Sequence, residues 1–400
     1  MKNKWVKLRH KIVRVVGYCI IAPYSRLKYG VKVERFREQE KRPYLILLNH
    51  QTAFDQFFVG MAFKGPVYYL ASEDIFSNGF VSSLIKYLVA PIPIKKQTVD
   101  AKSIINIFRV AKEGGTIAIA PEGNRTYSGI TGYMNPSIAP LARRLGMPIA
   151  LYRIEGGYGA HPRWSDVVRR GKMRGYVSRV VSPEEYASLS DDELFEIIKN
   201  ELYVNEAVAD SQFKHKKLAE YLERALYVCP YCGLSTFESH NDVVKCKKCE
   251  REIRYLPTKE LEGVGFEFPF RFVAEWYDYQ VDFVNALNVL EYDEAPMYTE
   301  SADLYEVTPC KRKDLIAERM QISLYGNRVE WVTADGKTVS TFEDISSIAV
   351  LGRNKLNVYC ASKVYQLKGG KRFNALKYVN MYHRYKNIVK GDVYGKFLGL

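Results

Sequence analysis

The sequence of 400 residues has no apolar stretch long enough to cross a lipid bilayer. Near the N-terminus the longest uncharged apolar run, Val15 to Ala22, has only eight residues, whereas a spanning helix needs about 20. A secretory signal is not expected either, because no small-residue cleavage site follows this run and Arg26 and Lys28 come soon after it. With 47% apolar residues the chain has enough for a core, so we expect a folded protein that is soluble or peripheral to a membrane.

Cysteine is scarce, with seven residues, but four of them form two Cys-x2-Cys pairs. Cys229 and Cys232 are separated by thirteen residues from Cys246 and Cys249, which is the arrangement of a four-thiolate zinc ribbon. Two disulfides are the alternative, but the lack of a secretory signal and the scattered remaining cysteines favour a reducing compartment. We therefore predict that these four cysteines hold a structural Zn²⁺, since four thiolates leave no open position for catalysis.

Positive charge is in excess, with a net charge of +14, and residues 1–42 alone carry thirteen Lys/Arg and three Glu. A basic arm of this kind indicates an anionic partner, either nucleic acid or lipid headgroups. Apolar residues in the same segment follow helical spacing, namely Trp5, Leu8, Ile12, Val15, Val16 and Cys19. This combination is typical of helices on a membrane surface, although an ordinary packed helix with a solvated basic face has the same spacing.

From this segment we predict basic amphipathic membrane-surface helices over residues 1–42. The protein is then expected to be peripheral, at the cytoplasmic face of the cell membrane. Nucleic acid is the less favoured partner.

Residues 43–226 are expected to form the next domain, and from 43 to about 182 its sequence alternates between strand-like and helix-like runs. The expected strands are Tyr44–Leu48, Val67–Leu70, Thr116–Ala120, Ile149–Ile154 and Tyr176–Val181. The expected helices are Gln56–Phe63, Phe80–Leu88, Thr98–Lys112 and Ser137–Leu145. Ser190 and Glu193 have capping-box spacing, which predicts a helix from about 191 to 205, followed by a charged helix to about 226. The alternation predicts an α/β layer fold.

The second half of the chain divides by composition into a zinc ribbon at 227–256, a linker at 257–297 and a β-rich domain at 298–400. The linker is expected to contain an aromatic helix, Ala274–Leu290, and a helix at Phe373–Lys386 is expected to close the last domain. The expected meander begins at Ile322, with strands at Arg328–Thr333, Thr338–Phe342, Ile345–Leu351, Leu356–Cys360 and Val364–Leu367. Strands closed by one helix are typical of small barrels of the pleckstrin-homology type, an analogy that specifies no ligand.

A histidine and an aspartate, His50 and Asp55, follow directly after the apolar strand pattern at 44–48. A histidine with an orienting carboxylate is what proton abstraction from a hydroxyl requires. Five positions on a regular helix are about 140° apart, so a loop or turn must bring the two side chains together. Two other interpretations stay open: His50 as an ordinary core or surface residue, and Asp55 as the N-cap of the helix Gln56–Phe63.

Two further segments suit an anionic ligand. The first, Pro121-Glu122-Gly123-Asn124-Arg125-Thr126, ends a buried strand; a guanidinium matches phosphate, and Gly123 allows close approach of the backbone. The second, Ile92-Pro93-Ile94-Lys95-Lys96, places two lysines at a strand end. The alternative for both is a loop with solvated cations.

In this order, the segments resemble the motifs of the 1-acylglycerol-3-phosphate acyltransferase family, which are glycerolipid acyltransferases. The family carries His-x4-Asp, then a basic residue after an Ile-x-Ile-like stretch, then Pro-Glu-Gly-x-Arg-Ser/Thr, then a proline that opens a strand, here Pro148. The resemblance covers the region from residue 10 to residue 205 and implies a mixed sheet flanked by helices. Two positions depart from the family: Lys96 stands where arginine is usual, and Ala120 where phenylalanine is usual.

The resemblance implies an O-acyltransferase in which His50 is the general base on an acceptor hydroxyl and Asp55 holds the imidazole tautomer. The hydroxyl attacks an acyl thioester, either acyl-CoA or acyl carrier protein, directly. No serine nucleophile is needed, and the chain has no Gly-x-Ser-x-Gly motif. The implied acceptor is a lysophospholipid, 1-acylglycerol 3-phosphate, which would give phosphatidic acid.

The resemblance also implies the residues that hold the acceptor. Arg125 and Lys96 would bind its phosphate, with Lys95 as a helper, and Glu122 and Gly123 would shape the substrate-binding loop. A hypothesis of another class is a non-catalytic lipid- or nucleic-acid-binding protein that uses the ribbon and the C-terminal domain. The intact His/Asp pair and Glu-Gly-x-Arg loop argue against a degenerate enzyme.

Overall fold

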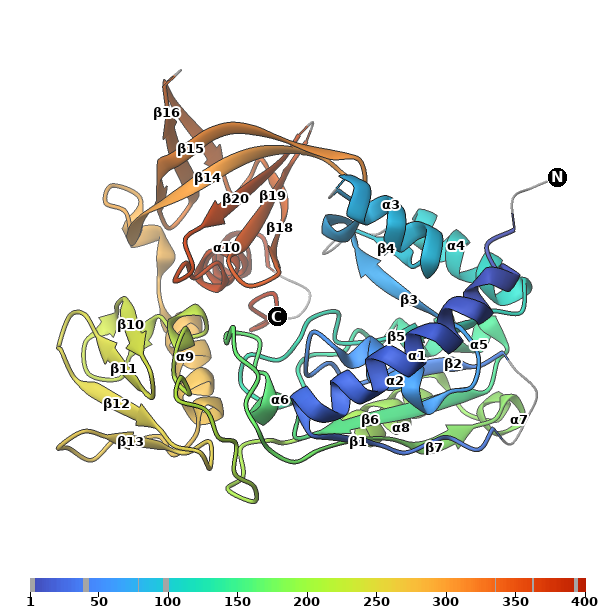
Figure 1. The fold of residues 1–400 in the computed structure, drawn as a ribbon. Coiled ribbons are helices and arrows are strands. Elements are labelled where there is room, and N and C mark those ends of the chain that lie inside the picture. Colours follow the sequence, from blue (N-terminus) through green and yellow to red (C-terminus); the bar gives the residue numbers. More distant parts are fainter. Residues whose placement is uncertain are drawn as a thin grey trace.

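The protein is described here by a computed structural model that covers residues 4–38, 43–77, 79–95, 101–334, 336–361, 363–391 and 395–400. The N-terminal half is built on a seven-stranded sheet in the order β1-β7-β6-β2-β5-β3-β4 (Figure 1). Its strands are β1 Val31–Val33, β2 Leu45–Leu48, β3 Val67–Ser72, β4 Ile92–Ile94, β5 Thr116–Ile119, β6 Ile149–Glu155 and β7 Met173–Val181. β2 is parallel to β5 and β6, whereas β6 and β7 are antiparallel, so the predicted α/β fold with a mixed sheet is confirmed.

Helices cover both faces of this sheet. They are α1 Leu8–Tyr29, α2 Asp55–Ala62, α3 Gly79–Leu88, α4 Ala101–Lys112, α5 Ile138–Leu145, α6 Gly157–Ala160, α7 Pro183–Ala187 and α8 Asp191–Leu202. Strand β2 is buried along its whole length: Leu45 and Leu47 pack with α4, α5 and α8, while Ile46 and Leu48 pack with α1 and α2. Because successive side chains of a strand point to opposite faces of the sheet, this one continuous apolar run contributes to the cores on both faces.

The segment after α8 differs from the prediction of a charged helix to about residue 226. Ser190 and Glu193 do form the predicted capping box at the start of α8, but from 203 the chain is irregular up to the short 3-10 turn η2, Leu222–Arg224. The ring of Phe213 is buried and lies against Gly159 and Gly171, where a Cβ would come within 2.2 and 2.1 Å of it. Phe213 is thus fixed by tertiary packing, which can outweigh the helical propensity of a charged segment.

The cysteine-containing segment folds into short antiparallel strands. They are β8 Val228–Cys229, β9 Gly233–Leu234, β10 Phe237–His240, β11 Val243–Cys246, β12 Glu252–Tyr255 and β13 Leu261–Gly263. The aromatic helix α9, Val273–Ala286, packs on them: Trp276 Nε1 donates to the Val228 carbonyl at 2.8 Å. α9 ends before the predicted Leu290 because the Asn288 side chain begins a new 3-10 turn, η3 Val289–Tyr292.

The C-terminal region is a seven-stranded sheet in the order β17-β16-β15-β14-β20-β19-β18, closed by helix α10, Leu376–Val389 (Figure 1). Its strands are β14 Tyr298–Thr308, β15 Arg312–Leu324, β16 Arg328–Thr333, β17 Gly336–Thr341, β18 Ile345–Leu351, β19 Lys355–Cys360 and β20 Val364–Gly369. The predicted β-rich domain with a closing helix is confirmed, but the predicted meander begins too late. β14 and most of β15 precede Ile322, and β15 is largely exposed over residues 312–319, so no apolar alternation marks it.

The second half of the chain shares one apolar core, which includes Val228, Trp276 and Leu356. It also docks on the first half. Asp74, in the 3-10 turn η1 (Glu73–Ser77) that follows β3, forms ion pairs with Lys313 and with Lys355. The β14–β15 hairpin extends to this turn and to α3 (Figure 1), so the C-terminal domain is fixed beside the carboxyl edge of the first sheet.

Candidate active site

His50 lies in the loop that leaves β2, at the carboxyl edge of the three parallel strands β6, β2 and β5. The preceding Asn49 fixes this loop to β6. Its side-chain amide donates to the Ile154 carbonyl at 2.8 Å, and its side-chain carbonyl accepts the Ile154 N–H at 2.7 Å. A buried strand that ends in an anchored loop thus presents the imidazole, 28% exposed, at the edge of the sheet.

The structure brings the predicted histidine and aspartate together: His50 Nδ1 lies 2.8 Å from Asp55 Oδ2. The Asp55 side chain is 1% exposed. Its carboxylate also accepts the backbone N–H of Gln51 at 2.7 Å, the backbone N–H of Thr52 at 2.9 Å and the Thr52 hydroxyl at 2.7 Å. An ionised carboxylate has the acceptor capacity for all of these donors. We therefore assign the proton to Nδ1, which leaves the Nε2 lone pair as the basic position of the ring.

Asp55 is the first residue of α2 and not its N-cap, which is Phe54 without a side-chain cap. Its carboxylate turns back toward residues 50–52 instead of capping the helix. The N-cap interpretation of Asp55 is therefore wrong, and the helix start instead presents the carboxylate to His50.

The loop after β5 is joined directly to the histidine loop. Glu122 accepts the His50 N–H at 2.7 Å on Oε1 and the Gly132 N–H at 2.9 Å on Oε2, and the Thr126 N–H donates to the His50 carbonyl at 3.3 Å. Burial raises the pKa of Glu122 to about 8, although these two backbone donors favour the charged carboxylate. Through these hydrogen bonds Glu122 connects the loop that carries His50 to the loop that follows β5.

Gly123 has φ +65, in the left-handed region, and a Cβ built there would meet no atom within 4 Å. The positive φ is what requires glycine at this turn.

Arg125 is the cation of this loop. Its Nη1 is buried and has no hydrogen-bond partner among the described residues. Burial, followed by repulsion from Arg163 and Arg353, lowers the pKa of Arg125 to about 10, while Asp55 acts in the opposite direction. This guanidinium is therefore close enough to the His50–Asp55 pair to interact with its carboxylate, and it has a donor left for an anion.

Arg163, Arg353 and His161 are site residues that the sequence reasoning missed. The Arg163 guanidinium donates to the Arg125 carbonyl at 3.1 Å and lies 4.3 Å from the centre of the Tyr127 ring. The predicted strand Ile149–Ile154 could have indicated His161 and Arg163, because the segment that follows this strand must begin at the same edge of the sheet as the His50 loop. Arg353 lies two hundred residues away and carries no such signal.

Lys95, of the second motif, follows a strand that lies further along the sheet from β2, the strand that leads into the His50 loop. Lys95 is exposed at the end of β4 and interacts electrostatically with Glu73. β3 separates β4 from β5 in the sheet, which places the two strands about 10 Å apart. Lys96 lies outside the described residues.

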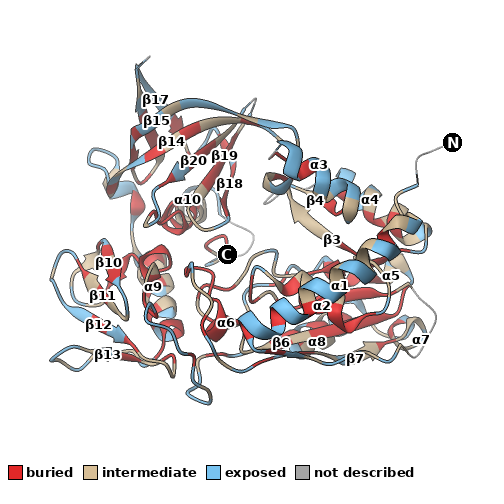
Figure 2. Cartoon of the chain, viewed as in Figure 1, coloured by how far each residue is buried: buried red, intermediate tan, exposed pale blue. Residues whose placement is uncertain are grey.

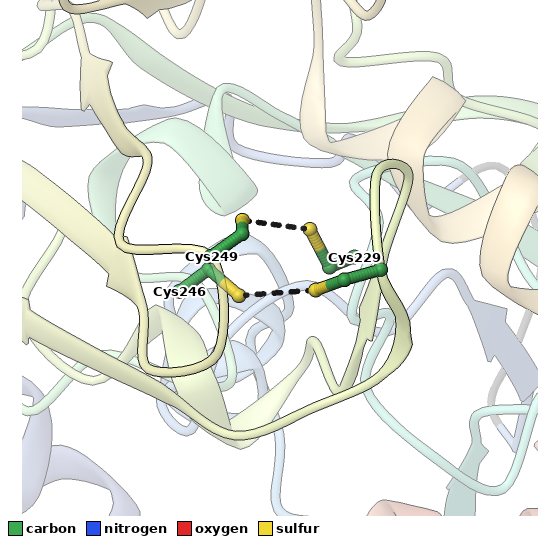
Figure 3. A group of neighbouring side chains, drawn as sticks. Cys229, Cys246 and Cys249 are labelled. Atoms are coloured by element: carbon green, nitrogen blue, oxygen red, sulfur yellow. Dashed lines mark hydrogen bonds between the residues drawn. The ribbon is translucent and has the colours of Figure 1, made fainter.

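The four predicted cysteines converge in the second half of the chain (Figure 3). Their Sγ atoms all lie within 4.8 Å of one another, with Cys229–Cys249 at 3.7 Å and Cys232–Cys246 at 3.6 Å. A disulfide requires about 2.05 Å, whereas a tetrahedral zinc with bonds of about 2.3 Å separates its sulfurs by about 3.8 Å. The donor set and its spacing therefore fit a four-thiolate zinc site and not two disulfides.

The structure thus places an oriented imidazole beside a Glu-Gly-x-Arg loop at the carboxyl edge of a mixed sheet, as the acyltransferase motifs predicted. Residues 30–153 match the Acyltransferase family model. The chain is 22% identical over 172 residues to the 1-acyl-sn-glycerol-3-phosphate acyltransferase of Bacillus subtilis (strain 168). The aligned region covers 42% of this chain and 81% of that protein. The chain therefore carries an acyltransferase domain, and the resemblance read from the motifs is confirmed.

A solved structure, the 1-acyl-sn-glycerophosphate acyltransferase PlsC from Thermotoga maritima, is similar with a TM-score of 0.40 and 19% identity, covering 48% of this chain and 78% of that one. The family match ends at residue 153. The cysteine cluster and the C-terminal sheet both lie outside it.

Proposed function

We propose that the enzyme transfers a fatty acyl group from an acyl thioester to the free hydroxyl of 1-acylglycerol 3-phosphate and so makes phosphatidic acid. The observation that carries this proposal is the 2.8 Å contact between His50 Nδ1 and Asp55 Oδ2. The backbone of His50 is in turn hydrogen-bonded to Glu122 and Thr126, in the loop that contains Arg125. The name of the Bacillus subtilis relative supports the acceptor. The donor is acyl-CoA or acylated carrier protein.

In the proposed reaction His50 Nε2 takes the proton of the acceptor hydroxyl as its oxygen attacks the thioester carbonyl carbon. Asp55, with four donors holding it in place, stabilises the imidazolium that forms. The carbon–sulfur bond then breaks, and the thiolate leaves with the proton that the imidazolium returns. Arg125 binds the acceptor phosphate and places the hydroxyl at Nε2.

The proposal is tested with the purified full chain, acyl-CoA and a panel of acceptors in neutral detergent micelles, with release of free thiol as the readout. We expect turnover with 1-acylglycerol 3-phosphate and a kcat/KM lower by about 10- to 100-fold for monoacylglycerol, because the lost charge-assisted hydrogen bonds to phosphate have this magnitude. Equal rates for the two acceptors would contradict the phosphate site. No turnover with any lysolipid and either donor would favour the binding-protein hypothesis.

We also propose that the enzyme works on an anionic membrane surface, at the cytoplasmic face of the cell membrane. Much of α1 is exposed (Figure 2). Its exposed large apolar residues include Leu8, Ile12, Val15, Val16, Ile20 and Leu27. α3, which contacts α1, adds Phe80, Val81, Leu84 and Tyr87. Exposed Lys11, Arg26, Lys28 and Lys86 border this surface, which suits a partner with an apolar interior and anionic headgroups.

No helix of the described residues is long and apolar enough to cross a membrane. Trp5, which the amphipathic pattern included, packs inward, with Nε1 donating to the Ala90 carbonyl at 2.8 Å. The proposed membrane surface therefore consists of α1 from Leu8 onward together with α3.

Aspartate in place of both Ile20 and Leu27 is expected to weaken binding to vesicles of neutral and anionic phospholipid by at least about 10-fold, since each side chain loses roughly 1.5–3 kcal/mol of burial. The two side chains are 67% and 85% exposed, so the fold should survive. Sedimentation with vesicles measures the partition. Val264→Asp is the matched control, because Val264 is 42% exposed on the cysteine-containing half; an equal loss in this control would refute the assigned surface.

A further inference from the structure

A turn of the C-terminal sheet reaches the acyltransferase site. Arg353 lies between β18 and β19, and its guanidinium contacts two residues of the loop between α6 and β7. Nη1 lies 3.1 Å from Asp166 Oδ1, and Nη2 lies 2.8 Å from His161 Nε2. The appended domain therefore places a cation beside Arg125 and Arg163.

His161 shows how firmly Arg353 is oriented. Burial, followed by Arg125 and Arg353, lowers the pKa of His161 to about 3, so the ring is neutral. Because Arg353 donates to Nε2, the ring proton must be on Nδ1, which lies 3.3 Å from the Tyr29 hydroxyl. Tyr29 at the end of α1, His161 and Arg353 thus form one hydrogen-bonded series at the site.

The carboxylates near these guanidinium groups are already in use. Asp166 is shared between Arg353 and Arg224, with Arg224 Nη1 at 2.6 Å. Asp55 is held by His50 and three other donors. Arg163 is 3% exposed and makes no ion pair among the described residues.

Around Arg125, Arg163 and Arg353, positive charge therefore exceeds negative charge. In the same place Arg125 Nη1 is buried and has no hydrogen-bond partner among the described residues. Uncompensated buried charge is costly, and a phosphate monoester, with its several acceptor oxygens, is the group that guanidinium clusters bind. The Arg353 side chain is 31% exposed, so it is not fully enclosed by its contacts to Asp166 and His161.

We propose that Arg353 of the C-terminal domain is a binding residue for the phosphate of the acceptor lipid and completes the site formed by Arg125 and Arg163. This inference rests on the proposed function and deepens it. The appended domain then has a role in the reaction, since the acyltransferase domain alone lacks one of its phosphate-binding cations.

Alanine in place of Arg353 is expected to raise KM for 1-acylglycerol 3-phosphate by about 10- to 100-fold, with kcat and the KM for acyl-CoA nearly unchanged. Turnover of monoacylglycerol, which has no phosphate, should not respond. Arg353→Lys should recover part of the acceptor affinity, because it keeps the charge but not the fork. The matched control is Arg179→Ala, which removes a similarly exposed arginine (39%) that pairs with Glu185. Arg179 lies opposite Leu151, toward the amino end of β6 and so at the other edge of the sheet.

An unchanged acceptor KM in Arg353→Ala would overturn the inference. A rise in the KM for acyl-CoA alone would also overturn it, because Arg353 would then bind the phosphates of the donor. A loss shared equally with Arg179→Ala or with monoacylglycerol would show a merely structural role. To separate this from the proposed function, equilibrium binding of 1-acylglycerol 3-phosphate in neutral micelles is measured in a His50→Ala background. Binding that depends on Arg353 without any wild-type turnover would refute the acyltransferase proposal and keep the phosphate site; binding indifferent to Arg353 would refute the site.

Discussion

Alanine in place of His50 is expected to lower kcat with 1-acylglycerol 3-phosphate by about 10²- to 10⁴-fold, the usual contribution of a positioned general base. The acceptor KM should change little, because the phosphate is held by the arginines and not by the imidazole. Asp55→Asn should also be severely impaired. Its amide would face the Nδ1–H of His50 and the N–H groups of Gln51 and Thr52 with one acceptor fewer, and the ring would lose its assigned tautomer.

The measurement is thiol release under saturating acyl-CoA, with thermal unfolding of each variant recorded in parallel. His240→Ala is the control, since His240 is a surface histidine with a side chain 71% exposed. His50 is 28% exposed and makes its side-chain contact to Asp55, so its truncation should leave the unfolding temperature close to that of the wild type. A His50→Ala enzyme that retains the wild-type kcat would eliminate the proposed mechanism, whatever the acceptor.

The core of the site was predictable because it depends on local pattern. An apolar run as short as 44–48 has the length of a buried strand and is short for a helix. The residues after buried parallel strands meet at one edge of the sheet, which is where His50 and the Glu122–Arg125 loop lie. The contact between the two loops follows from the adjacency of β2 and β5. Sequence order alone did not fix that adjacency, but the ordered motifs implied it through the family resemblance.

What the sequence did not predict are contacts made across long separations. Arg353 contacts His161 and Asp166 because the C-terminal sheet docks on the first half of the chain, in part through Asp74 of η1, and no local periodicity encodes that docking. The irregular course around Phe213 has the same cause, since two distant glycines make room for its ring. The strand β15 was missed because its exposed residues carry no period-two apolar pattern.

The cysteine cluster lies outside the acyltransferase domain, yet its metal is expected to matter for the entire second half of the chain. We propose that Cys229, Cys232, Cys246 and Cys249 bind one structural Zn²⁺. Cys229 and Cys246 are buried members of the same apolar core as Trp276 of α9 and Leu356 of β19. A structural zinc contributes its binding free energy to folding, about 10–16 kcal/mol in small zinc-binding units, so its removal should loosen this shared core.

Serine in place of Cys246 is expected to reduce bound zinc from about one per chain to a small fraction and to lower the unfolding temperature by many degrees. Elemental analysis of the purified chain and a thermal unfolding scan measure the two effects. Cys19→Ser is the matched control, because Cys19 is exposed on α1 and far from the cluster in sequence. Full zinc content in Cys246→Ser, or a metal-free wild type that unfolds at the same temperature as the metal-loaded one, would refute the structural zinc.

The zinc also provides a link to the active site, because the strands beside Arg353 belong to the core that the metal stabilises. If Arg353 binds the acceptor phosphate, mild removal of zinc by a chelator should raise the acceptor KM in the same direction as Arg353→Ala, before His50-dependent turnover is lost. In the Arg353→Ala enzyme the same treatment should add little to the acceptor KM, since the cation that it displaces is already gone. An equal and independent rise in both enzymes would show that zinc and Arg353 act separately.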